Sequence, residues 1–538
     1  MIFLFSNSVA VAQTQKQSLI KISKETTWIE SPIGKDGFVD YEAWINQRYG
    51  EGLKADQNAL VDLLKIFGPG EMDEQVAKML LQRLQLKEFP EAKKKYRFAR
   101  DYLLAAGGTP DQLKKVKNPM EAMMIRMMAE MAYHPPTEPW NREDHAEVAK
   151  WLDEMGDTLE EVAVALESKE VYVPIMLDYE GPISPFKVDL LFGFERNVLE
   201  KQYLCEDFIV RAMYHLGLGQ LDECERYLLA TRRLTLLLGD YPFAKYDRDA
   251  LDGLIAYFSL FNAECTFARH PAVTADRILK YRAKMKMLVS PDFMLKGNEF
   301  GLRIEILHRI TRAARWREGD RQWAIDDGLT NLLSESEIKP DWNAALTITN
   351  ELMDRVAKAL KTADYTEAKK LYDKFLADRD PTKVAEQDSP AEMKMARQIV
   401  AAMLPFSLLL ISESRDYHVC ETTADMYLAI WAYKKDHGSF PDTLKQLPPK
   451  YCDAVGTDTY SGKEIIYRRW DEEFVIYSVG PDGKDELQTR PLNPKEIFAN
   501  IADHEEVHSA LLGIGSRVYA KDTSKFIRRI FESQKFGE

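Results

Sequence analysis

Apolar residues recur at helical spacing through most of the first 380 residues of the chain. In the run Asn58–Phe67, residues Leu60, Leu63, Leu64 and Phe67 share one face, and Gly68-Pro69-Gly70 ends the pattern. The same periodicity predicts helices over residues 73–84, 90–106, 119–133, 142–155, 197–216, 221–238 and 251–267. Strand-like alternation is almost absent before Tyr460, and only Val171-Tyr172-Val173 indicates a short extended segment. Residues 13–380 are therefore predicted to form a mainly α region.

Two segments have the pattern of helical hairpins of the tetratricopeptide kind, in which small residues let two helices touch and a turn joins them. In the first segment Ala212 and Cys224 are the small residues, His215 and Leu228 are the large ones, and Leu218-Gly219 is the turn. In the second segment the corresponding pattern is formed by Ala363, Asp364, Tyr365, Ala368, Tyr372 and Pro381. A steady period of about 34 residues is not found. The pattern predicts an irregular array of helical hairpins, and arrays of this kind commonly present a concave surface to a partner.

The periodicity changes after a polar linker at residues 380–390. One long helix is predicted from Ala391 to His437, bent at Pro405. Residues 464–469 and 473–479 alternate as two strands joined by a turn at Trp470-Asp471-Glu472. We therefore expect a small α+β module over residues 391–490, after the array, and a C-terminal helical tail over residues 491–538.

Several motifs of this module resemble the globular domain of the major pseudopilin of type II secretion. They are Tyr433 near the end of the long helix, the segments His437–Pro441 and Asp458–Gly462, Tyr467, and the segment Tyr477–Gly483. The resemblance implies a helix packed on a small antiparallel sheet, followed by an acidic loop that can hold calcium. In this chain the loop offers Ser478, Asp482, Asp485 and Glu486 as calcium ligands. Because calcium takes six to eight oxygen ligands, a solvated turn is the competing interpretation.

The chain also departs from the pseudopilin pattern. It carries no prepilin cleavage motif and no long apolar first half of the helix, so polymerisation into a pseudopilus is not supported. As a whole, the chain resembles a group of uncharacterised exported bacterial proteins with helical, tetratricopeptide-like repeats. The segments Gly37–Tyr41 and Asn58–Pro69 carry that wider resemblance.

The charge of the chain and the spacing of its cysteines each argue against one class of ligand. The 86 acidic and 72 basic residues give a net charge of -14 that is spread along the chain, which argues against binding of nucleic acid. The five cysteines show no metal-ligand spacing, and Cys420 with Cys452 is the disulfide pair to test.

Residues 1–12 are expected to be the remnant of a signal peptide, because the small-x-small pattern Ala10-Val11-Ala12 precedes a polar stretch from Gln13. The mature chain would then be exported to the periplasm or cell envelope, and it would be cytoplasmic if residues 1–12 are not such a remnant. No transmembrane segment is expected in the mature chain. Its most apolar run, Ile399–Ile411, is interrupted by Pro405 and is shorter than the roughly 20 residues that a bilayer requires.

One motif indicates zinc chemistry. His504-Glu505-Glu506-Val507-His508 matches HExxH, in which two histidines on one helical face bind zinc and the glutamate, here Glu505, activates a water. Glu532 is the candidate third ligand. The charged neighbours Asp503 and Glu506 favour an ordinary solvated helix instead.

A methionine stripe is the other unusual pattern. Six methionines recur at helical spacing, namely Met120, Met123, Met124, Met127, Met128 and Met131. A buried helix face explains this spacing. An adaptable binding surface or a copper(I) site are the alternatives.

The leading hypothesis is a non-enzymatic interaction or scaffolding protein of the bacterial cell envelope, which binds protein partners through its helical array. The alternative is a zinc-dependent hydrolase that uses the motif at residues 504–508.

Overall fold

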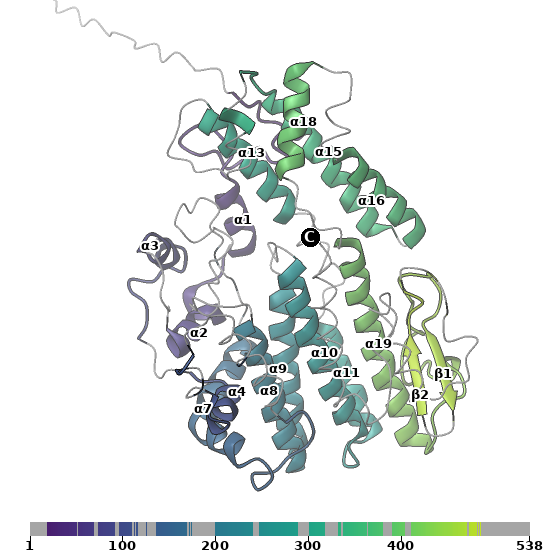
Figure 1. The fold of residues 1–538 in the computed structure, drawn as a ribbon. Helices are drawn as coiled ribbons and strands as arrows, with labels where there is room; N and C mark the ends of the chain where they lie inside the picture. Colours follow the sequence, from purple (N-terminus) through teal and green to yellow (C-terminus); the bar gives the residue numbers. More distant parts are fainter. Residues whose placement is uncertain are drawn as a thin grey trace, which may run out of the picture. The chain divides into compact units, whose positions relative to one another are not determined.

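The computed structural model shows a mainly α-helical protein with one two-stranded sheet in its described part (Figure 1). It describes residues 19–116, 136–174, 199–239, 247–288, 301–317, 332–379, 390–403 and 410–485, apart from short gaps within these ranges. The predicted fold class, mainly α, is confirmed at this level.

The chain forms two compact units, each assembled from separated stretches of sequence. Unit 1 comprises Met1–Arg48, Arg303–Asp354 and Phe375–Pro405, and unit 2 comprises Tyr49–Leu302, Arg355–Lys374 and Phe406–Glu538. Helices α1 (Tyr41–Gly50), α15 (Trp342–Lys361) and α16 (Tyr365–Arg379) each contribute residues to both units.

Unit 1 holds an N-terminal segment against helices from the middle of the chain. Its own helices are α13 (Arg303–Arg317) and α18 (Ala391–Met403), which pack on each other. The Asn350 side chain on α15 donates to the carbonyls of Glu25 and Thr26, over 3.0 and 2.7 Å. The hydroxyl of buried Tyr41 donates to the Thr27 carbonyl over 2.9 Å. These bonds satisfy backbone groups of a segment that lies outside regular secondary structure.

Unit 2 contains the remaining described elements. They are η1 (Ala55–Gln57), α2 (Ala59–Phe67), α3 (Glu74–Arg83), α4 (Ala99–Ala106), α7 (Ala146–Ser168), α8 (Leu199–Gly217), α9 (Leu221–Gly239), α10 (Asp247–Arg269), α11 (Ala275–Leu288), α19 (Leu410–His437), η3 (Leu444–Gln446), β1 (Ile466–Trp470) and β2 (Glu473–Tyr477). The helices predicted over residues 58–67, 73–84, 197–216, 221–238 and 251–267 correspond to α2, α3, α8, α9 and α10. The helix predicted at 142–155 extends to Ser168, and the one predicted at 90–106 begins only at Ala99.

The start of α2 shows how a single side chain sets a helix boundary. Asn58 is the N-cap, and its side-chain oxygen accepts from the Leu60 N–H over 3.0 Å. The same oxygen accepts from the Tyr172 N–H, while the amide group donates to the Tyr172 carbonyl over 2.8 Å. Asn58 thus holds Tyr172 beside the start of α2, and a bridge joins Asn58 to Glu170.

Helices α8 and α9 form the first predicted hairpin. Gly219 adopts φ +70° in the turn between them, a conformation that glycine reaches without strain. Ala212, Cys224 and Leu228 are fully buried, as expected for residues at a close helix contact. In the second predicted hairpin, Ala368 and Tyr372 are buried on α16, whereas Ala363 and Pro381 lie outside the described residues.

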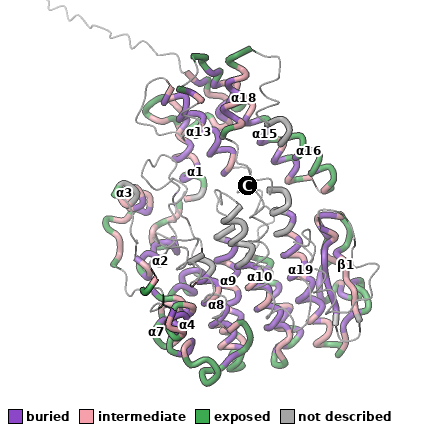
Figure 2. The backbone as a smooth tube through the Cα atoms, in the orientation of Figure 1, coloured by how far each residue is buried: buried purple, intermediate pink, exposed green. Residues whose placement is uncertain are grey.

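Five helices of unit 2 divide into inner and outer members. We call α8 and α10 the inner helices; they contain the buried runs 207–210 and 263–268 (Figure 2). We call α7, α9 and α11 the outer layer. Helix α9 contacts both α7 and α11 and is largely buried, with Asp222 as the one exposed residue in its described part, so the exposed charges of this layer lie mainly on α7 and α11.

The predicted α+β element is present as α19 with β1 and β2. The strands pair antiparallel from Ile466↔Tyr477 to Trp470↔Glu473, and β2 packs against α19. The predicted helix over residues 391–437 is described as two helices, α18 and α19; Pro405 and its neighbours at 404–409 lie outside the described residues.

The structure divides the chain differently from the consecutive domains that the sequence indicated. Helix α19 packs on α10 and α11 as well as on β2. The Arg282 guanidinium on α11 donates to the Asp425 carboxylate on α19 and to the Tyr451 carbonyl, over 2.6 and 2.5 Å. The helical array of unit 2 and the α+β element therefore share one hydrophobic core. Residues 1–12, the linker at 380–389 and the tail from residue 486 lie outside the described residues.

Candidate functional site

The structure does not describe the predicted zinc motif. His504, Glu505, His508 and Glu532 all lie beyond residue 485, outside the described residues. The methionine stripe at Met120–Met131 also lies outside them. Within the described ranges, no three His, Cys, Asp or Glu residues gather as a metal site would require.

Two of the four predicted calcium ligands are described, and both contact other protein groups. The Ser478 hydroxyl is buried and donates to Asp458 Oδ1 over 2.6 Å. Asp485 accepts from Arg468 over 2.8 Å and from the Tyr477 hydroxyl over 2.7 Å. The other two predicted ligands, Asp482 and Glu486, lie outside the described residues, so the calcium site stays a prediction.

Asp458 organises the loop before the sheet. It was not among the site residues predicted from the sequence. Its carboxylate is fully buried and accepts four hydrogen bonds. Oδ1 accepts from the Tyr460 N–H and the Ser478 hydroxyl, at 3.0 and 2.6 Å. Oδ2 accepts from the Ser461 hydroxyl and the Val479 N–H, at 2.7 and 3.3 Å. A buried carboxylate with this set of donors joins the loop to the end of β2.

All five cysteines are buried and none of them forms a disulfide, so the Cys420–Cys452 pair is not joined in the structure. Burial raises the pKa values of the Cys205, Cys224 and Cys265 thiols. Thiols with raised pKa values are poor nucleophiles, which argues against cysteine catalysis at these three positions.

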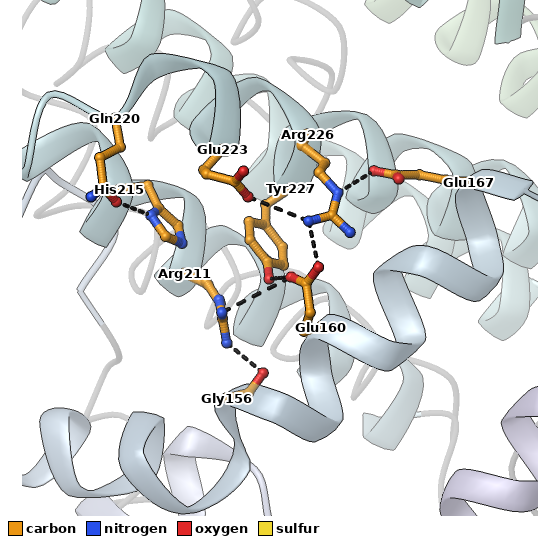
Figure 3. A network of polar contacts seen from close by, with 9 residues as sticks. All are labelled: Gly156, Glu160, Glu167, Arg211, His215, Gln220, Glu223, Arg226 and Tyr227. Carbon is orange, nitrogen blue, oxygen red and sulfur yellow. Dashed lines mark hydrogen bonds and ion pairs between the residues drawn. The ribbon is translucent and has the colours of Figure 1, made fainter.

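A network of polar residues joins α7, α8 and α9 around the Tyr227 ring (Figure 3). The His215 imidazole stacks on Tyr227 with ring centroids 5.5 Å apart and an interplanar angle of 5°. His215 Nδ1 lies 2.7 Å from Gln220 Oε1, so the neutral ring carries its proton on Nδ1. The Arg211 guanidinium lies 4.9 Å from the Tyr227 centroid and donates to the Gly156 carbonyl.

The other half of this network pairs carboxylates with Arg226. The Tyr227 hydroxyl donates to Glu160, whose carboxylate also lies 2.5 Å from Arg226. Arg226 further contacts Glu167 at 2.7 Å and Glu223 at 3.3 Å (Figure 3). Burial alone would raise the pKa of Glu160, but hydrogen bonds from Tyr227 and Arg226 lower it. Glu160 is therefore ionised at neutral pH, and the network joins three helices rather than supplying a proton donor.

A second network joins four helices in the core of unit 2. Arg232 on α9 and Glu264 on α10 have side-chain exposures of 0% and 1%, and they form a bidentate pair at 2.8 Å. The Tyr281 hydroxyl on α11 donates to Glu264 over 2.7 Å. Arg232 also donates to Glu421 on α19 over 2.6 Å. This arrangement satisfies the buried charges that would otherwise destabilise the core.

No local pattern indicates the second network, because Arg232 is separated from Glu264 by 32 residues and from Glu421 by 189 residues along the chain. Asp458 lies within a motif that the sequence analysis quoted, yet its role depends on Ser478 and Val479, which follow a complete strand.

Among the described residues, no helix combines the length and the apolar composition that crossing a membrane requires.

Comparison with known proteins provides no relative for this chain. No protein-family model, no curated protein and no solved structure matches it.

Proposed function

We propose that this chain is a non-enzymatic interaction or scaffolding protein of the bacterial cell envelope, which binds protein partners through the outer layer of its helical array. The observation that carries the proposal is that α7 and α11, on either side of the largely buried α9, expose charged residues over the shared core of unit 2. A layer of neighbouring helices on a shared core offers an extended surface for a partner.

The charged networks support this proposal. Arg226 and Arg232 use their guanidinium groups to connect neighbouring helices. Ion pairs of this kind fix the relative positions of helices, and a fixed surface loses less conformational freedom when a partner binds. The envelope location depends on the signal-peptide remnant predicted at residues 1–12 and is part of the proposal.

The proposed binding surface is not the concave surface that the repeat pattern predicted. A concave surface in such an array is lined by the inner helices, and the described side chains of α8 and α10 are mostly buried. The exposed residues Asp157 and Glu161 on α7, and Lys280 and Lys284 on α11, belong to the outer layer instead. We therefore place partner binding on the outer layer.

Affinity capture from bacterial envelope extract tests the proposal with the full chain as bait. We expect at least one protein to bind the wild-type chain and to be lost with Asp157→Lys/Glu161→Lys, which reverses charge on the exposed face of α7. The matched control is Glu367→Lys/Glu464→Lys, an equal charge change on exposed residues of α16 and of the loop before β1, which should retain the partner. Capture that is absent, or that is the same for both variants, would contradict the proposal.

A further inference from the structure

The outer layer of unit 2 changes sign from one edge to the other. Helix α7 carries seven acidic residues and a single lysine. Helix α11 carries five basic residues and a single aspartate. Helix α9 lies between them and contacts both: Arg226 binds Glu160 and Glu167 of α7, and Glu225 binds Arg277 of α11. The layer therefore has an acidic edge and a basic edge.

Both edges carry exposed charged side chains. Asp157 and Glu161 are exposed one turn apart on α7. On α11, the Lys280 and Lys284 side chains are 71% and 51% exposed. Lys280 pairs with Asp276 within its own helix at 2.8 Å, and Lys284 lies 3.4 Å from Glu225 on α9. Because both lysines are more than half exposed, these pairs contribute little and exchange readily.

Exposed apolar side chains accompany these charges. The described residues of unit 2 include three large hydrophobic side chains that are markedly exposed, namely Val164 on α7, Leu218 in the turn before α9, and Met287 on α11. Met287 is the most exposed of them, at 79%. Apolar groups among charges are typical of protein interfaces, where the charges set orientation and the apolar groups contribute binding energy.

A surface with one acidic and one basic edge is complementary to itself when it is rotated by a twofold axis through its middle. In that arrangement α7 of each copy faces α11 of the other, so every favourable contact occurs twice. We propose that two copies of this chain pair through their outer layers, with α7 of one copy against α11 of the other. The pairing rests on the proposed function, in which the outer layer is the binding surface, and it names a second copy as the partner.

Sedimentation velocity of the full chain measures the pairing directly. At low ionic strength we expect a species with twice the mass of the chain, and we expect it to dissociate when salt is raised to about 0.5 M, where the Debye length falls to a few Å. A chain that stays monomeric at micromolar concentrations in low salt overturns the pairing. The capture experiment tests the proposed function separately, because a monomeric chain can still retain a different partner.

Charge reversal identifies the surface. Asp157→Lys/Glu161→Lys places positive charge against α11 of the partner copy, and Lys280→Glu/Lys284→Glu places negative charge against α7. Each double variant alone is expected to be monomeric. An equimolar mixture of the two should restore the dimer, as should one chain that carries all four substitutions. Glu367→Lys/Glu464→Lys is the control and should dimerise as the wild type does.

The mixing experiment distinguishes a lost interface from a folding defect. Mixing the two variants restores opposite charges across the interface, but it would not repair a chain that fails to fold. Circular dichroism spectra matching the wild type confirm that each variant is folded. A dimer that persists in both reversal variants, or a mixture that remains monomeric, overturns the assignment of this surface.

Discussion

At the residue scale, ionisable side chains of unit 2 act mainly as links between helices. Arg232, Glu264 and Tyr281 come from three helices and form one buried group, to which α19 adds Glu421. Removing one member of a buried charged pair typically costs about 3–5 kcal/mol, because the remaining charge loses its partner. The positions of α9, α10, α11 and α19 are therefore coupled through a few side chains.

His215 is the residue for which a pH dependence can be argued. Burial lowers its pKa below the ordinary value near 6.5, outweighing the hydrogen bond to Gln220 that would raise it. The nitrogen Nε2 is buried and has no hydrogen-bond partner in the described structure. The charged groups facing it are Arg211 on its own helix, Glu160 on α7, and Glu223 on α9.

We therefore expect acid to weaken the packing of α8 and α9. Because the folded-state pKa is lowered, the unfolded state binds more protons as the pH falls below about 6.5, and stability is lost in that direction. Hydrogen exchange of amides in α8 and α9, corrected for intrinsic rates, should show less protection at pH 5.5 than at pH 7.5. His215→Phe retains an aromatic ring over Tyr227 and should show a smaller change. An equal change in both proteins would exclude His215 as the cause; amides in α19 serve as the internal reference.

At the element scale, the contact of α8 with the segment before α7 depends on a glycine. A Cβ added at Gly217 would lie 2.4 Å from the Trp140 carbonyl oxygen and 3.0 Å from its backbone nitrogen. Trp140 is itself fixed, since its indole N–H donates to the Val210 carbonyl over 2.8 Å. The close approach leaves no room for a side chain at this position.

Gly217→Ala is expected to destabilise unit 2 by about 1–3 kcal/mol, the usual cost of overpacking. The matched control is Gly156→Ala, where the new methyl group would meet the end of the Arg211 side chain at 2.8 Å. A flexible side chain can move whereas backbone cannot, so the control should cost less. Urea denaturation followed by tryptophan fluorescence measures both variants. Equal midpoints for Gly217→Ala and the wild type would show that the contact with Trp140 is not close in solution.

At the scale of the whole molecule, the proposed function and the zinc alternative predict different metal contents. An interaction protein has no need of a bound metal, so we expect the full chain to retain much less than one zinc per chain after dialysis against metal-free buffer. Elemental analysis of the purified protein measures this. Near-stoichiometric zinc that disappears in His504→Ala would contradict the proposal and favour a hydrolase. Glu505→Ala is the control, because it would remove the general base and leave both histidine ligands in place.

The helices were predictable where one apolar stripe faces a core, as in α2, whose N-cap Asn58 and terminal Gly68 also mark its ends. The apolar periodicity predicted a helix only as far as Met155, although α7 continues beyond it. Its second half buries Leu159, Val162, Ala163 and Leu166 and continues the helix to Ser168. The strands were found within two residues of their ends because alternation has a period of two and the turn between them is short.

By itself, the sequence determined the secondary structure of much of the chain and its mainly α class, since both depend on periodicity within a few residues. Only the tertiary structure decided that α19 packs on α10 and α11, and that residues 303–354 join the N-terminal segment in unit 1. It also decided that most described residues of α8, α9 and α10 are buried while α7 and α11 expose charged faces. These features depend on contacts between residues far apart in the chain. Local patterns indicate that a helix has an apolar face, but they do not specify which other element covers it.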